Sequence, residues 1–279
     1  MNIIFITTAT LSGLGLFLAL IIYFVSKKFQ VVEDLRIDMV EELLPAANCG
    51  GCGQPGCRAF AEALVKADDI SKLICPVSGK NEMEKIAEIL GKKATISEPK
   101  VAVVRCNGSC ENRQKVNEYQ GTETCAIESA LYGGETNCFY GCCGWGDCVA
   151  ACKFDAIVMD KTKGLPTVFE DKCMACGACI KACPKNILEL RKLGPKKRRI
   201  YVSCINKDKG AIANKVCSVA CIGCGKCLKE CKFEAITIEN NLAYIDFEKC
   251  KICRKCVEVC PKKSIIEVNF PPKKSVISE

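Results

Sequence analysis

The sequence predicts an α+β protein with an apolar N-terminal helix followed by a cysteine-rich body of short helices and strands. Three observations lead to this prediction. Residues 1–26 carry no charged side chain. The 279-residue chain contains 26 cysteines, most of them in C-x-x-C groups. Four similar cysteine runs in the C-terminal half each lead into a β-prone segment. The length is sufficient for several domains.

The first element is the apolar segment "MNIIFITTATLSGLGLFLALIIYFVS". A helix over Ile3–Val25 would be about 35 Å long, which is enough to cross a bilayer core. A cleaved signal peptide is the alternative, but the segment has no basic n-region and no small-residue cleavage site after it. We therefore predict a transmembrane anchor over residues 1–28.

Two basic residues follow the anchor, Lys27 and Lys28. The positive-inside rule then predicts a single-pass protein of the cytoplasmic (inner) membrane, with the bulk of the chain on the cytoplasmic side. That compartment is reducing, so thiolate ligands are expected there and disulfides are not.

Residues 29–92 are expected to form one small module with flanking helices. "NCGGCGQPGC" supplies Cys49, Cys52 and Cys57, and Cys75 follows further on, immediately before a proline. Four thiolates in this spacing suit one metal centre. Helices are predicted before Pro45, after Cys57 and over "NEMEKIAEILGKK", where Asn81 and Glu84 have capping-box spacing and Gly91 marks the C-terminus.

Residues 93–137 form a connecting segment whose function the sequence does not indicate. "KVAVVRC" predicts a buried strand, "NG" a turn, and "CAIESALYGG" a short helix that ends at Gly133. Beyond it, an internal repeat predicts two tandem domains, 138–203 and 204–279. Corresponding cysteines are 31 residues apart in the first domain (Cys152 and Cys183) and 29 apart in the second (Cys231 and Cys260).

The repeated run C-x2-C-x2-C-x3-C-P is typical of bacterial two-cluster ferredoxins, in which the fourth cysteine ligates the other cluster. A zinc ribbon needs only two C-x-x-C pairs, so the last cysteine would be superfluous there. We therefore predict two tandem bacterial-ferredoxin-like (2x[4Fe-4S]) domains and, with the N-terminal module, five [4Fe-4S] clusters. The predicted ligand sets are Cys49, Cys52, Cys57 and Cys75; Cys173, Cys176, Cys179 and Cys152; Cys221, Cys224, Cys227 and Cys260; and Cys250, Cys253, Cys256 and Cys231.

The fifth predicted cluster has an irregular run, "CFYGCCGWGDC", in which Trp145 occupies the middle ligand position. Cys142, Cys148 and Cys183 are predicted ligands, and either Cys138 or Cys143 completes the set. Cys138 is favoured because adjacent cysteines usually point in different directions. A three-iron cluster is the alternative.

Six cysteines remain outside these sets, and burial as small apolar side chains is the simplest interpretation of them. A sixth site near Cys106, Cys110 and Cys125 is an alternative, but it has no obvious fourth ligand. The six cysteines are Cys106, Cys110, Cys125, Cys143, Cys204 and Cys217.

Composition excludes several functions. The chain has no histidine, so His-ligated haem, Rieske centres and catalytic triads are ruled out. The formal charge of +8 counts cysteines as neutral, and five clusters at roughly −2 each would change it to about −2. A nucleic-acid partner is therefore not expected. The basic run 191–199 is interpreted as an exposed turn, with docking of an acidic partner as the alternative.

The order of anchor, "NCGGCGQPGC…CP" module and ferredoxin-like runs resembles the B subunits of Rnf complexes over nearly the whole chain. The resemblance implies a membrane-bound translocase that passes electrons between reduced ferredoxin and NAD and moves Na⁺ or H⁺. It implies that this chain is the ferredoxin-facing electron-transfer component, with other Rnf subunits carrying flavin and NAD. It also supports Cys138, Cys142 and Cys148 as ligands. No dinucleotide-binding fingerprint or Walker A motif occurs here, and no complete active site is expected.

Two other functions fit parts of the sequence. The chain could be a polyferredoxin subunit of another membrane oxidoreductase such as a hydrogenase, or, with less support, a zinc-ribbon nucleic-acid-binding protein. The N-terminal cysteine module argues against the first, and the spacing of the repeated runs argues against the second.

Overall fold

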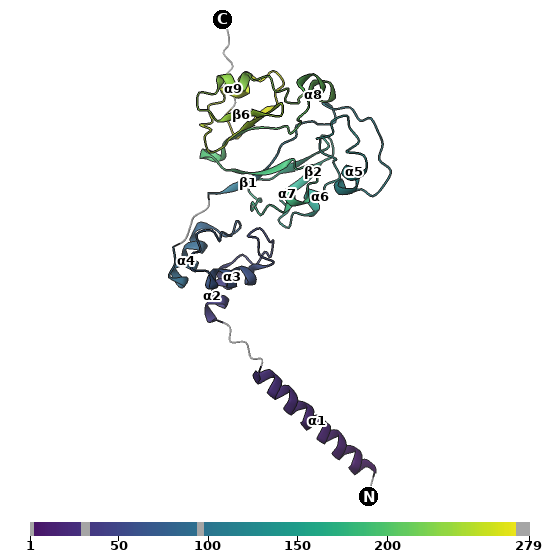
Figure 1. Cartoon of the computed structure of the whole chain (residues 1–279), viewed down its shortest axis with the longest axis vertical. Coiled ribbons are helices and arrows are strands. Elements are labelled where there is room, and N and C mark those ends of the chain that lie inside the picture. Colours follow the sequence, from purple (N-terminus) through teal and green to yellow (C-terminus); the bar gives the residue numbers. More distant parts are fainter. Residues whose placement is uncertain (1–2, 29–33, 94–97, 272–279) are drawn as a thin grey trace.

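The computed structural model describes residues 3–28, 34–93 and 98–271. Figure 1 shows a long helix, a small helical module and a larger body that contains all of the labelled strands. Mixed helices and strands with an apolar N-terminal helix confirm the predicted α+β class.

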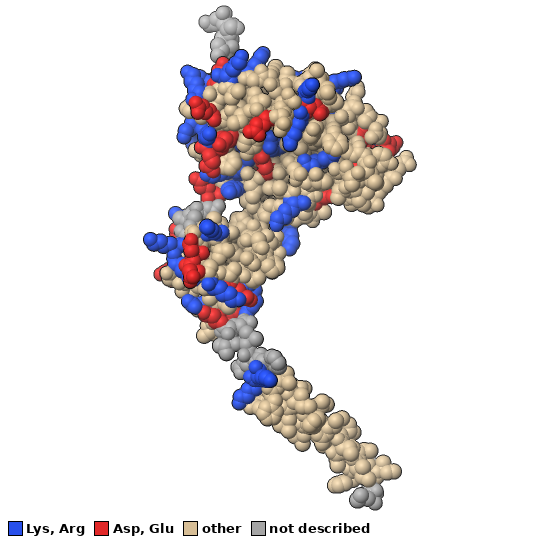
Figure 2. Space-filling model, in the orientation of Figure 1, with Lys and Arg blue, Asp and Glu red and all other residues tan. Residues whose placement is uncertain are grey.

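The N-terminal helix α1 spans Ile3–Lys28, and it is the one helix among the described residues that is long and apolar enough to cross a membrane. Figure 2 shows an uncharged surface along α1 except at its C-terminal end, where Lys27 and Lys28 lie. Its threonine hydroxyls donate to carbonyls one turn earlier, for example Thr10 Oγ1 to Ile6 O at 3.0 Å. These polar groups therefore need no water, which suits a lipid environment.

Three helices form the N-terminal module: α2 (Leu35–Leu43), α3 (Cys57–Lys66) and α4 (Lys80–Leu90). Their apolar faces pack into one core around the fully buried Phe60, Leu64 and Ile86. The predicted helix before Pro45 corresponds to α2; the part before residue 34 lies outside the described residues.

The ends of α4 differ in how well the sequence predicted them. The predicted capping box of Asn81 and Glu84 is wrong, because α4 begins at Lys80 with Gly79 as its N-cap. Glu82 occupies the third helical position instead, and its carboxylate folds back over Gly79. The predicted C-terminus is confirmed: Gly91 adopts the left-handed conformation at φ 64° and ends the helix.

The body consists of two units, each with two antiparallel strand pairs and three short helices, of which two begin within the cysteine runs. The first unit contains β1 (Lys100–Val104) paired with β4 (Leu188–Lys192), β2 (Ile157–Asp160) paired with β3 (Leu165–Val168), α5 (Cys125–Leu131), α6 (Asp147–Ala150) and α7 (Ala178–Ala182). The second contains β5 (Arg199–Val202) paired with β8 (Ile265–Val268), β6 (Ile236–Glu239) paired with β7 (Leu242–Ile245), α8 (Gly210–Val216), α9 (Lys226–Glu230) and α10 (Lys255–Glu258). A short 3₁₀ turn, Pro195–Lys197, connects β4 to β5.

The predicted hairpin of the second unit is confirmed. Ile236 pairs with Ile245, and Ile238 pairs with Ala243. The turn residues Asn240 and Asn241 both have positive φ, 47° and 61°. Two consecutive left-handed residues give the turn whose twist matches that of the flanking strands, and asparagine tolerates this conformation.

Strand pairing crosses two of the predicted domain boundaries. β1 lies in the predicted connecting segment 93–137 but pairs with β4 of the first unit. β5 lies in the predicted first domain, 138–203, but pairs with β8 of the second unit. The two units share a core where β1 meets β5. This core is formed by the buried side chains of Val101, Val103 and Tyr201.

Candidate metal centres

Cysteine side chains line five cavities, each with about 300 to 360 Å³ of empty space including its open mouth. Among the described residues, no three Cys, Asp or Glu side chains converge closely enough to hold one metal ion. A structural zinc site brings four sulfurs to about 2.3 Å from one atom. The wider spacing of the cysteines fits a group the size of a [4Fe-4S] cube.

The N-terminal module brings its four predicted cysteines around one cavity: Cys49, Cys52, Cys57 and Cys75. The Asn48 side-chain oxygen accepts from the Cys57 backbone N–H at 2.8 Å, which fixes the loop to the start of α3. The backbone N–H of Ser78 donates to the Cys75 sulfur at 3.4 Å. Such N–H···S bonds stabilise thiolate ligands of iron–sulfur clusters.

The second unit forms two four-cysteine sites with the predicted crossing. Cys260 lines the cavity of Cys221, Cys224 and Cys227, and Cys231 lines the cavity of Cys250, Cys253 and Cys256. The crossing arises because each run ends in a short helix that carries its last cysteine away from the loop and toward the other site. Cys224 and Cys253 are exposed.

In the first unit, Cys152 lies with Cys173, Cys176 and Cys179, as predicted. Burial, and then the neighbouring thiolates of Cys173 and Cys176, raise the pKa of Cys179 to about 12. The backbone N–H of Ala102 in β1 points to the Cys173 sulfur at 3.5 Å. Because such buried thiols resist ionisation alone, a positively charged iron–sulfide core would supply the compensating charge.

The irregular run differs from its prediction. Cys142, Cys148 and Cys183 line one cavity together with Cys125 and Cys143, whereas Cys138 lines another. Spacing alone favoured Cys138, but α5 folds back so that its first residue, Cys125, reaches this site.

Asp147 and Trp145 hold α5 in that position. One carboxylate oxygen of Asp147 accepts from the Cys125 N–H at 2.9 Å, and the other accepts from the Ala126 N–H at 3.1 Å. The Trp145 indole N–H donates to Glu128 at 3.0 Å. The tryptophan that replaces a ligand in the run therefore anchors the helix that delivers another cysteine.

Cys125 and Cys143 have opposite electrostatic surroundings. A hydrogen bond from Cys143 is the main cause that lowers the pKa of Cys125, to about 6. The same contact, burial and the charge of Glu128 raise the pKa of Cys143. Glu128 is completely buried. A thiolate is thus favoured at Cys125 and disfavoured at Cys143.

The remaining cysteines do not group as the alternative sixth site of Cys106, Cys110 and Cys125 requires. Cys106, Cys138, Cys204 and Cys217 line one cavity, while Cys125 lies in the cavity of the irregular run and Cys110 is exposed. Sequence reasoning missed Cys204 and Cys217 because they lie far along the chain from the other two. The only signal available was that both fall outside the repeated runs.

The structure of the basic run 191–199 supports the interpretation as a turn, since it connects β4 to β5 and several of its charges are paired within the body. Lys192 contacts Glu98 and Glu248, Lys197 contacts Asp171, and Arg199 contacts Glu170. Arg191 is almost completely buried.

Three family models match parts of the chain: "Putative Fe-S cluster" over residues 44–72, "4Fe-4S binding domain" over 166–189 and "4Fe-4S dicluster domain" over 220–264. They cover parts of the N-terminal module and of both units. Iron–sulfur binding is therefore supported in all three parts of the chain outside α1.

Curated relatives match nearly the whole chain. The B subunit of the Na(+)-translocating ferredoxin:NAD(+) oxidoreductase complex of Acetobacterium woodii is 44% identical over 95% of this chain and 78% of its own length. The B subunit of the proton-translocating ferredoxin:NAD(+) oxidoreductase complex of Clostridium ljungdahlii is 41% identical over 95% and 93%. The B subunit of the ion-translocating oxidoreductase complex of Methanosarcina acetivorans is 40% identical over 92% and 96%.

Each of these alignments covers more than nine-tenths of the chain. Together with the 4Fe-4S domains, they define an electron-transfer iron–sulfur subunit of an oxidoreductase that is associated with the membrane. The chain belongs to the family of B subunits of ion-translocating ferredoxin:NAD oxidoreductase (Rnf) complexes.

Proposed function

We propose that this protein accepts electrons from reduced ferredoxin and relays them, reversibly, toward the flavin- and NAD-carrying subunits of its complex. The single observation that carries the proposal is the succession of four-cysteine sites from the second unit to the N-terminal module. Bound [4Fe-4S] clusters supply one-electron transfer. The residues of this chain fix the spacing of the sites and their exposure to solvent.

Close contacts connect the N-terminal module to the first unit. The Lys153 side chain donates to the Asn48 carbonyl at 3.0 Å. Gly51 lies against Cys176, since a Cβ at residue 51 would be 2.8 Å from the Cys176 carbonyl oxygen. Burial and then the Cys49 thiolate, among its neighbours, raise the pKa of Cys176. These contacts support direct electron transfer between the two sites.

Ferredoxin is proposed to dock on the second unit, where ligand cysteines reach the surface. Cys224 and Cys253 are exposed, and the exposed Lys226, Lys251 and Lys255 lie within two residues of them in sequence. A basic surface steers acidic partners and increases their association rate. We assign docking to this surface and not to the run 191–199, because Lys192, Lys197 and Arg199 of that run are paired internally.

The charge reversals Lys251→Glu and Lys255→Glu, made together, test this docking surface. We expect the second-order rate of reduction by ferredoxin at low salt to fall about tenfold, with little change at high salt, because steering is screened. Lys161→Glu, an exposed reversal on the first unit, is the control and should have little effect. Equal loss in both variants would contradict the proposed surface.

A separate experiment tests whether ferredoxin, and not NADH, reduces this protein directly. Stopped-flow absorbance should show rapid bleaching of the purified protein by reduced ferredoxin and no bleaching by NADH alone. Rapid reduction by NADH in the absence of the rest of the complex would overturn the assignment of flavin and NAD to partners. It would favour a different kind of oxidoreductase component.

The orientation and the coupled ion are also part of the proposal. Lys27 and Lys28 follow the apolar stretch of α1, so the body is proposed to lie on the cytoplasmic side of the inner membrane. Electron flow is proposed to be coupled to Na⁺ or H⁺ transport by the membrane subunits. Protease added to spheroplasts should leave the body intact, and digestion from outside would reverse the orientation.

A further inference from the structure

We propose that Cys106, Cys138, Cys204 and Cys217 bind a sixth [4Fe-4S] cluster between the two ferredoxin-like units, and that Cys125 completes the neighbouring site of Cys142, Cys148 and Cys183. The proposal goes beyond the relay described above, since it adds a cluster and reassigns one ligand. It rests on the convergence of four cysteines, on hydrogen bonds to their sulfurs, on the charge of the cavity and on its position.

The four cysteines come from strand ends, a helix end and a loop, which hold them around one cavity of about 330 Å³ including its open mouth. Cys106 follows β1 and Cys204 follows β5. The ends of these two strands are joined by a hydrogen bond from Asn107 N–H to Ser203 O at 3.1 Å and one from Ser203 Oγ to Val104 O at 3.2 Å. The ends of β1 and β5 therefore form part of the cavity wall.

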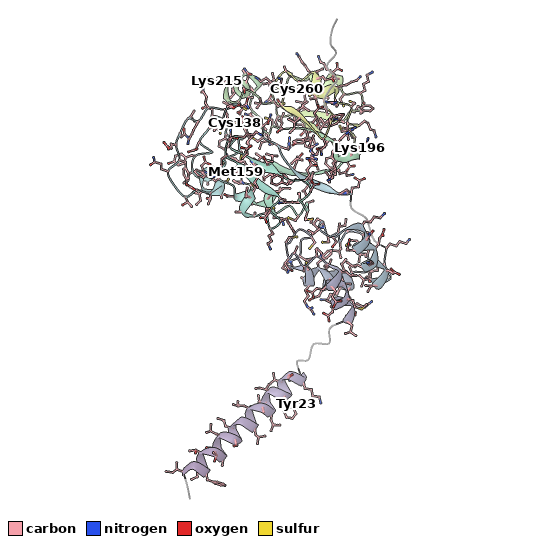
Figure 3. The ribbon with its side chains drawn as sticks, turned by 180° about the vertical axis from the view of Figure 1, so that it is seen from behind. Tyr23, Cys138, Met159, Lys196, Lys215 and Cys260 are labelled. Carbon is pink, nitrogen blue, oxygen red and sulfur yellow. The ribbon has the colours of Figure 1, made fainter. Side chains whose placement is uncertain are left out.

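Cys217 and Cys138 complete the wall. Cys217 is the C-cap of α8, and its sulfur would lie 3.2 Å from a Cβ placed on Gly108. Glycine at 108 thus leaves room for the sulfur. Cys138, Cys204 and Cys217 are all at most 9% exposed. Figure 3 shows the labelled Cys138 between Met159 of the first unit and Lys215 of α8 in that view.

The buried residue Asn206 directs two N–H donors at cysteine sulfurs. The backbone N–H of Asn206 points to the Cys204 sulfur at 3.4 Å, and its side-chain NH₂ points to the Cys138 sulfur at 3.6 Å. Asn206 is 1% exposed. Donors aimed at sulfur stabilise thiolates and raise the reduction potential of a cluster. Two neutral thiols would need no such arrangement.

The charge of the cavity favours an anionic occupant. Arg105 and Arg113 both line it, and no Asp or Glu is among its lining residues; Arg105 is paired with Glu189 beyond the lining at 3.2 Å, which leaves Arg113, among the residues that the structure describes, as the lining charge without a carboxylate partner. Arg113 is 7% exposed and donates from Nη1 to the Cys142 carbonyl at 2.7 Å. Its Nε is buried without a hydrogen-bond partner within the described part of the chain. A buried guanidinium requires a counter-charge, and a cubane with four thiolates carries roughly −2.

The position of the cavity connects two sites that would otherwise be separated. Cys106 packs against the first unit's core, which contains Cys142 and Cys148. Cys204 and Cys217 pack in the second unit's core with Cys221. A cluster here lies between the site of Cys142 and the site of Cys221. It divides one long electron-transfer step into two shorter ones.

A single zinc ion is the main alternative occupant. The described cysteines do not converge closely enough for one ion, so zinc would require the walls to move inward. At about 330 Å³ with its open mouth, the cavity is similar in size to the three that hold the predicted sets of the N-terminal module and the second unit, which have about 300 to 360 Å³. Its size therefore favours the cube.

Iron and labile-sulfide analysis of the full-length chain tests the proposal. Six cubanes require about 24 iron atoms per chain, whereas five require about 20. Cys204→Ser and Cys217→Ser should each lose about four iron atoms, while the other clusters keep their EPR signals. Cys110→Ser is the matched control, because Cys110 is exposed and outside every described cavity set; it should retain all of the iron.

A second pair of variants tests the reassigned ligand. Cys125→Ser should damage the same cluster as Cys183→Ala, and Cys138→Ser should damage the same cluster as Cys217→Ser, judged by which EPR signal disappears. Arg113→Lys keeps all cysteines and the positive charge but alters the donor; it should keep about 24 iron atoms per chain and shift the EPR signals of the sixth cluster and of the neighbouring cluster of Cys142, whose carbonyl accepts from Arg113. The iron content of the wild-type chain answers the question even if a cysteine variant fails to fold.

Three results would overturn the proposal. They are about 20 iron atoms per chain in wild type with none lost in Cys217→Ser, one zinc per chain lost in that variant, or identical signal losses in Cys138→Ser and Cys183→Ala. None of these measurements uses ferredoxin or NADH. The proposal of a sixth cluster can therefore be refuted while the proposed relay function stands. The relay function can likewise be refuted while the sixth cluster stands.

Discussion

At the scale of single residues, Asp147 determines which cysteine reaches the irregular site. Its carboxylate accepts two backbone N–H groups at the start of α5, and this tie brings Cys125 beside Cys148 in the same cavity. The spacing of cysteines in the sequence cannot reveal a ligand that is positioned by a carboxylate 22 residues away. The regular runs could be predicted because their spacing alone brings three sulfurs together.

Asp147→Ala should therefore release α5 and impair one cluster. We expect a loss of about four iron atoms per chain and a stability loss of about 1–2 kcal/mol, because two backbone N–H groups, one of them at the buried Cys125, lose their acceptor. Asp147→Asn keeps one acceptor oxygen and should be intermediate. Iron analysis and thermal unfolding check this result. Glu123→Ala, at an exposed position before α5, is the control, and an equal loss there would refute the explanation.

At the scale of elements, the hairpins and short helices explain why each run serves two sites. The β6–β7 turn and the inward-facing Ile236 and Ile245 could be predicted from Asn240–Asn241 and the alternating pattern. The partners of β1 and β5 could not, because the pairings Lys100 with Lys192 and Arg199 with Val268 join distant segments. Nothing local specifies such pairings, so the strand pairs cross the domain boundaries that the sequence predicts.

The crossing gives a prediction with a reciprocal control. Cys260→Ala should damage the cluster of Cys221, Cys224 and Cys227, since Cys260 lines that cavity. Cys231→Ala should instead damage the cluster of Cys250, Cys253 and Cys256. EPR of the two variants should show the loss of different signals, about one cluster each. Loss at the 250–256 site in Cys260→Ala would contradict the crossing.

At the scale of the whole molecule, the N-terminal module is the part of the cysteine-rich chain that follows α1 directly (Figure 1). Its contact with the first unit depends on close approach at Gly51, where a side chain would meet the Cys176 backbone and the Pro76 ring. Electron transfer slows steeply with distance. The rate of the proposed electron transfer therefore depends on how closely the module and the first unit approach each other.

Gly51→Ala should push the module away from the first unit. We expect the clusters of the body to be reduced by ferredoxin at the normal rate, while reduction of the module's cluster slows several-fold or more. Stopped-flow absorbance combined with freeze-quench EPR would separate the two phases. Pro55→Ala, an exposed change in the same loop, should leave both phases unchanged. A uniform slowing of both phases in Gly51→Ala would exclude this explanation.

The exposure of Cys224 and Cys253 has a further consequence for how the protein fails in air. Oxygen and peroxide attack iron–sulfur cubes most readily where solvent reaches them, so the two clusters of the second unit should degrade first. Brief aeration should then abolish the acceptance of electrons from ferredoxin while most of the iron is still bound. A brown preparation could thus be inactive, and colour would be a poor guide to its quality.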